Sequence, residues 1–153
     1  MAITQAMATS FKSEILQGYH QFTQPTLTSR TSLTAPTNDT FKIALYTSAA
    51  TLDATTTAYT ATNEVSGTGY TATGNTLNTV ALASSGTTAY LDWADSVWTT
   101  ATITARGAMI YNSTQGNKCV AILDFGADKT STAGDFTVVF PAAAAATAII
   151  RIA

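Results

Sequence analysis

The alternation of apolar and polar residues with a period of two, which begins at Phe41, constrains the fold more than any other feature of the sequence. In "FKIALYT", Phe41, Ile43 and Leu45 share one face while Lys42 and Tyr46 lie on the other, as in a half-buried strand. Further strands are expected in four other segments: "TTAYLDWADSVWTTATITARGAMIYN", which holds two, "KCVAILDFG", "DFTVVFP" and "TAIIRIA". Turn signals such as "STQGN" separate them. The pattern predicts an all-β fold, a single β-sandwich or jelly-roll-like domain.

The connections between these strands are expected to be irregular. The threonine, alanine and glycine-rich segment after Tyr46 is predicted to run over the surface, with short strands near Tyr59 and Tyr70. The alanine run at residues 142–146 follows a proline and precedes the last strand, so we interpret it as a tight crossing loop.

One short helix is expected at residues 9–20. Ser10 can cap its N-terminus and Glu14 is expected in its first turn, where the helix dipole favours a carboxylate. Gly18 falls where the helix would weaken, and a segment with two prolines and no periodicity follows. The sequence therefore predicts a short N-terminal helix and an extended arm in residues 1–40, and a β-sandwich domain in residues 41–153.

The apolar side chains of this helix are the candidate partner-binding residues. They recur on or near one face of the helix: Phe11, Ile15, Leu16 and Tyr19. Our hypothesis is that the helix and arm clasp a neighbouring subunit, so that a chain starting near Asn38 would remain folded. The alternative is that the helix covers one open end of its own sandwich.

Composition excludes several classes of function. Only 10% of the 153 residues are charged, against roughly 25% in an ordinary soluble domain, and the net charge is −2. Such a surface does not attract nucleic acid or acidic lipid. No window approaches the roughly 20 apolar residues of a membrane span, and the N-terminus lacks the pattern of a signal peptide. Cys119 is the only cysteine and His20 the only histidine, so we expect a buried, inert thiol, no metal site and no cofactor.

Two motifs invite an enzymatic interpretation. Asp124, Phe125 and Gly126 form a DFG triplet, but the glycine-rich loop, the lysine and the catalytic loop of a kinase are missing. We therefore expect Asp124 to close a strand and Gly126 to permit a turn. Asp92 and Asp95 could act as paired carboxylates, but we interpret them as surface residues at strand ends and expect no enzyme.

Large aromatic residues on the predicted strands offer another possibility. They could stack on sugars, although core packing explains them more simply: Tyr90, Trp93, Trp98 and Tyr111. A carbohydrate-binding module therefore stays open as an alternative.

Two long segments resemble a family of small virion structural proteins of tailed bacteriophages. They are "FKIALYTSAATLDATTTAYTATNEVSGTGYTATGNTLN" and "ARGAMIYNSTQGNKCVAILDFGADKTSTAGDFTVVFP" with the final "AIIRIA". The similarity extends from "SFKSEIL" to the C-terminus and carries no catalytic residues with it.

The resemblance implies a non-enzymatic virion protein, and we expect a capsid decoration, or cement, protein. Its partner would be the major capsid protein, it would lie on the capsid surface, and it would be assembled in the cytoplasm of the host bacterium. A homo-oligomer, most simply a trimer, suits such a position. The alternatives are a tail or head-to-tail connector protein, and a carbohydrate-binding module at the tail tip.

Overall fold

The structure, a computed structural model, describes residues 2–16, 18–20, 22 and 38–153. One short helix and eight strands occur in this part of the chain. In order they are β1 (Ala6–Met7), α1 (Thr9–Leu16), β2 (Phe41–Tyr46), β3 (Asn75–Thr76), β4 (Thr79–Ser85), β5 (Thr88–Trp93), β6 (Ser96–Asn112), β7 (Lys118–Val138) and β8 (Ile150–Ile152). The predicted all-β fold with a short N-terminal helix is confirmed.

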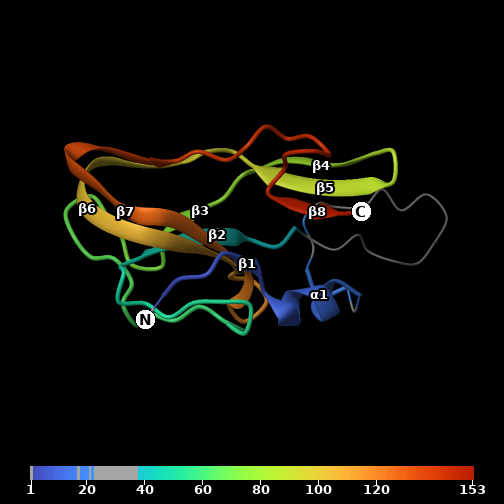
Figure 1. Ribbon diagram of the computed structural model, residues 1–153, viewed down its shortest axis with the longest axis horizontal. Coiled ribbons are helices and arrows are strands. Elements are labelled where there is room, and N and C mark those ends of the chain that lie inside the picture. Colours follow the sequence, from blue (N-terminus) through green and yellow to red (C-terminus); the bar gives the residue numbers. More distant parts are fainter. Residues whose placement is uncertain (1, 17, 21, 23–37) are drawn as a thin grey trace.

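The strands form two antiparallel sheets. One has the order β1-β7-β6-β2-β3 and the other the order β4-β5-β8. The long β6–β7 ribbon runs along the upper layer, turns over at one end of the molecule and returns along the lower layer (Figure 1). One ribbon thus supplies strands to both layers, so the core lies inside its bend.

The bend of the ribbon explains why one strand prediction was wrong. The register of β6 with β7 shifts between Ala105 and Gly107, and Arg106 in this bulge forms an ion pair with Asp128 of β7 at 2.7 Å. Gly126 has φ +74° but lies inside β7, so Asp124 does not close a strand. Residues 135–138 of the predicted strand "DFTVVFP" are the end of β7, which is continuous with the predicted strand "KCVAILDFG". A bulge bends the ribbon where the sequence predicted a turn.

The segment between β2 and β3 packs over the sheet instead of only running over the surface of the molecule. Tyr46, expected on an open face, is fully buried. Glu64 holds the cover in place, because its carboxylate accepts hydrogen bonds from Tyr59 Oη (2.6 Å), Tyr70 Oη (2.7 Å) and the backbone N–H of Thr73 (2.8 Å). Both faces of β2 are therefore covered, with Lys42 alone partly buried. The strand itself was predicted correctly, but the prediction that it is half-buried is wrong.

The N-terminal residues belong to the same fold as residues 41–153. β1 pairs with β7, and Ile3 lies in the core. α1 ends at Leu16, four residues earlier than predicted. The backbone N–H of Gly18 (φ +71°) bonds to the carbonyl of Ile15, and that of Tyr19 bonds to the carbonyl of Glu14, which is the Schellman arrangement that ends a helix. Most of the predicted arm, residues 21 and 23–37, lies outside the described residues.

The predicted cap of α1 was wrong. The helix begins at Thr9, so Ser10 lies in its first turn, and the Ser10 hydroxyl is buried without a hydrogen-bond partner in the described part of the chain. Glu14 lies in the second half of the helix. Its carboxylate forms hydrogen bonds with the side chains of His20 and Lys118 and does not interact with the dipole at the helix N-terminus.

Candidate functional site

α1 packs on the protein's own body. Phe11 is fully buried and its ring lies 4.8 Å from that of His20. Ile15 is partly buried against the core, Tyr19 is 46% exposed, and the side chain of Leu16 lies outside the described residues. Contact of these residues with a partner stays a prediction. With Phe11 in the core, however, the structure favours the alternative in which the helix covers its own sandwich.

A buried polar network fastens the end of α1 to the β6–β7 turn. Glu14 accepts a hydrogen bond from Lys118 Nζ through Oε1 (2.6 Å) and binds His20 Nε2 through Oε2 (2.8 Å). On the other side of the ring, His20 Nδ1 lies 3.0 Å from Asn112 Nδ2. His20 has no exposed side-chain surface, so each of its nitrogen atoms must find a partner inside the protein.

The orientation of Asn112 sets the tautomer of His20. Asn112 Oδ1 accepts the backbone N–H groups of Thr114 and Gln115, and Nδ2 also donates to Asp39 Oδ2 at 2.7 Å. The amide therefore offers a donor to His20, whose Nδ1 must accept, and Nε2–H then donates to Glu14. The network of Glu14, His20, Asn112 and Lys118, hereafter the latch, fixes where the chain leaves the body after α1.

An apolar groove opens between α1 and the β4-β5-β8 sheet. Its deeper part has a volume of about 150 Å³ and an almost wholly apolar lining: Phe11, Ile15, Phe22, Leu82, Ala89, Tyr90, Leu91, Ile150 and Ile152. It shares Ile15 and Ile152 with a wider hollow of about 510 Å³. Leu82 and Ile152 are about half exposed. This end of the sandwich therefore leaves apolar side chains in contact with water.

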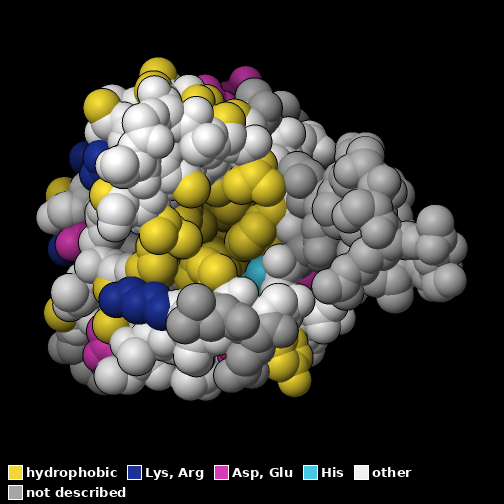
Figure 2. All heavy atoms as spheres, turned by 90° about the vertical axis from the view of Figure 1, so that its right-hand side faces the viewer, with side chains coloured by type: hydrophobic (Ala, Val, Ile, Leu, Met, Phe, Trp, Pro, Cys, Tyr) yellow, Lys and Arg dark blue, Asp and Glu magenta, His cyan; other side chains and the backbone are white. Residues whose placement is uncertain are grey.

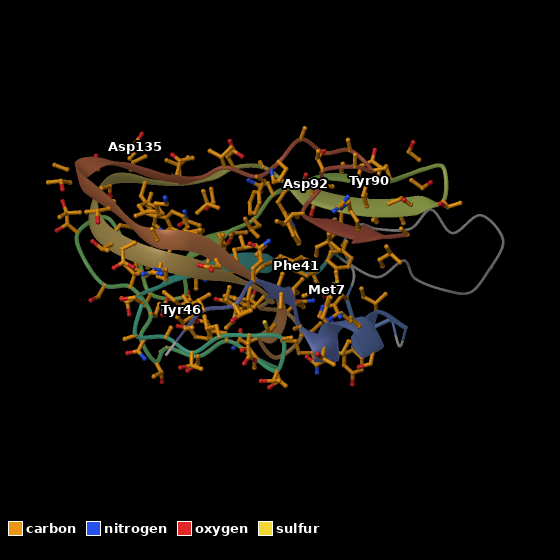
Figure 3. All side chains as sticks on the ribbon, in the orientation of Figure 1. Met7, Phe41, Tyr46, Tyr90, Asp92 and Asp135 are labelled. Carbon is orange, nitrogen blue, oxygen red and sulfur yellow. The ribbon has the colours of Figure 1, made fainter. Side chains whose placement is uncertain are left out.

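Two basic side chains border the groove. Lys12 and Arg151 line its wider part together with Met7. In the described part of the chain, neither forms an ion pair, whereas Lys118 and Arg106 both do. Figure 2 shows the hydrophobic hollow with a basic side chain at its edge, and Figure 3 shows Met7 between β8 and α1. The groove thus combines an apolar floor with two basic side chains that pair with no acidic side chain among the described residues.

Sequence reasoning identified part of the groove and missed the rest. Ile15 and Phe11 belonged to the predicted helix face, but β4 was not predicted, so Leu82 was missed. The rim residues were missed because Lys12 and Arg151 lie at opposite ends of the sequence. The one local signal was the alternation in "TAIIRIA", which placed Ile150 and Ile152 on one strand face.

Other candidate residues are buried. Trp93 and Trp98 are each 2% exposed, so neither can stack on a sugar in this structure, and Tyr111 is buried as well. Asp92 is also buried rather than a surface residue, and burial raises the pKa of its carboxyl. Trp93, Trp98 and Tyr111 are therefore core residues, as our simpler interpretation held, whereas Tyr90 is partly exposed and lines the groove.

Cys119 is expected to be unreactive in the folded protein. It is fully buried, as predicted, and burial raises the pKa of its thiol to about 12. Because the thiolate is the reactive form, a chromogenic thiol reagent at pH 8 should label the native protein negligibly and label one thiol per chain in denaturant. Rapid labelling of the native protein would show that the β6–β7 ribbon opens around Cys119.

Neither a metal cluster nor a membrane helix is found in the part of the chain that the structure describes. No three His, Cys, Asp or Glu side chains gather there as metal ligands, and no helix there has the length and apolarity to cross a bilayer. No family model, curated protein or solved structure matches the chain.

Proposed function

We propose that this protein is a non-enzymatic structural component of a tailed-phage virion, and within that class a decoration protein bound to the shell of major capsid protein. The observation that carries the proposal is the groove. An exposed apolar hollow with unneutralised charge at its rim is typical of a surface that another polypeptide completes. Components of multi-copy shells work through such surfaces, and the resemblance of residues 41–78, 105–141 and 148–153 to virion proteins supports the same class.

The architecture suits this role. Strands β6 and β7, of 17 and 21 residues, bend through both layers, so they tie the layers into one stiff body. Most exposed side chains of the ribbon carry a hydroxyl group. The hydroxyl oxygens of Thr104 and Thr130 lie 2.9 Å apart and form a hydrogen bond across the ribbon. A neutral, hydroxyl-bearing surface lets copies lie close together without the repulsion that a high net charge would cause.

Particle binding tests the proposal. Purified protein is added to particles that lack it, the particles are sedimented, and bound copies are counted against major capsid protein. We expect saturable binding at a copy number close to that of the capsid protein, and particles that withstand more heating once coated. Binding of only a few copies at one site would indicate a tail or connector protein instead, and no binding would contradict the proposal.

A further inference from the structure

A second exposed apolar surface lies on the outer face of the upper layer. Val97 is 41% exposed and Val139 is 70% exposed. Val97 lies opposite Thr137 in the β6–β7 register and Ser96 lies opposite Val138, which places Val139 across from Asp95. The buried side chains of Ser96 and Val138 point inward, so their neighbours point out.

Acidic residues flank these valines. Asp95 and Asp135 are both exposed on this face, and neither forms an ion pair with any described residue. Asp95 Oδ1 accepts the N–H of Phe140 (2.8 Å) and Asp135 Oδ1 accepts the N–H of Thr100 (3.2 Å), which fixes the direction of each carboxylate. We call Asp95, Val97, Asp135 and Val139 the valine patch.

The valine patch and the groove complement each other. Both are apolar at the centre, and the carboxylates that flank the patch have the opposite charge to Lys12 and Arg151 at the rim of the groove. Asp135 lies on the upper layer near the bent end of the ribbon, whereas Met7, which lines the groove, lies between β8 and α1 (Figure 3). The patch faces outward and the groove opens between α1 and the β4-β5-β8 sheet, so the two surfaces of one chain do not face each other, whereas those of two copies can.

We propose that copies of this chain associate head to tail, with the valine patch of one copy seated on the groove of the next. Because two different surfaces meet, the contact is heterologous and generates a ring when its rotation closes. Such a ring is the kind of homo-oligomer expected from the sequence. The inference deepens the proposed function by naming a partner of the groove, but it is tested in solution without a virion, so the two can fail separately.

The test uses one charge change on each surface. Val139→Lys places a cation on the patch, and Lys12→Glu places a carboxylate on the rim. Both positions are exposed, so the variants should fold. Matched controls make the same changes elsewhere on exposed β7 positions: Thr132→Lys and Lys129→Glu. Molar mass is measured by light scattering after size exclusion, at low and high salt.

We expect the wild-type chain and both controls to form oligomers that weaken with salt, and each surface variant to associate roughly tenfold more weakly, because like charges then face each other. Mixing the two variants should restore association, because the intact patch of the Lys12→Glu chain meets the intact groove of the Val139→Lys chain and the two altered surfaces carry opposite charges. A wild-type chain that stays monomeric up to about 1 mM, or a Val139→Lys variant that assembles like the wild type, would overturn the inference.

Discussion

Replacement of Phe11 by alanine is expected to lower the free energy of unfolding by about 3–5 kcal/mol, the usual cost of removing a buried phenylalanine side chain. Phe11 is fully buried, and its ring packs against His20 and Phe22. For a domain of this size that loss lowers the melting temperature by roughly 10 °C. Urea denaturation followed by circular dichroism measures it directly.

Tyr19→Ala is the matched control for Phe11→Ala. Tyr19 was also predicted to lie on the apolar face of the helix, but its side chain is 46% exposed. Among the described residues, the cation near its ring is Lys118, whose Nζ lies 5.1 Å from the ring centroid. We expect a loss of at most about 1 kcal/mol. If Phe11→Ala instead melted like the wild type and failed to bind particles, the helix would serve a partner, as in the clasp hypothesis.

A chain that starts near Asn38 should also melt far lower or aggregate. It would lose β1, Ile3 and Phe11, all of which pack into the sandwich. This reverses the outcome expected if the helix were a clasp for a neighbour. Retention of the wild-type melting temperature by the truncated chain would contradict the packing described here.

The sequence predicted most strands because alternation is a local property. "FKIALYT" and the beginning of "DFTVVFP" alternate within a few residues, and each lies in a strand of the structure. The continuity of β7 was not predictable in this way. A glycine after an aspartate indicates a turn as readily as a bulge, and only the pairing with β6 decides that Gly126 lies within a bent strand.

The groove and the latch could not be predicted from local sequence patterns, because each brings together residues that are far apart in the sequence. The groove joins residues near 12, 82 and 151, and the latch joins Glu14 to Lys118, which lies 104 residues away. Long-range contacts between loops carry little sequence signal in a single chain.

The pH dependence of stability should report on the latch. Burial alone would raise the pKa of the Glu14 carboxyl, but hydrogen bonds from Lys118 and His20 and the positive charge of Lys118 lower it below its usual value. A folded pKa below the unfolded value means that the carboxylate stabilises the fold above about pH 4.5 and that this contribution is lost as the pH falls through the folded pKa. The wild-type protein should therefore lose stability as the pH falls below about 4.5.

Glu14→Gln should isolate this contribution. The amide keeps the shape of the side chain but removes its charge, so at pH 7 we expect a loss of roughly 1.5–3 kcal/mol, the range for hydrogen bonds to charged groups. The difference between wild type and variant should then shrink below about pH 4.5, because protonation also removes the charge from the wild-type carboxyl. Asp128→Asn is the control, since its ion pair with Arg106 is partly exposed and should contribute at most about 1 kcal/mol. A Glu14→Gln variant whose stability runs parallel to that of the wild type from pH 7 to 3 would show that the charge of Glu14 does not hold the end of α1 in place.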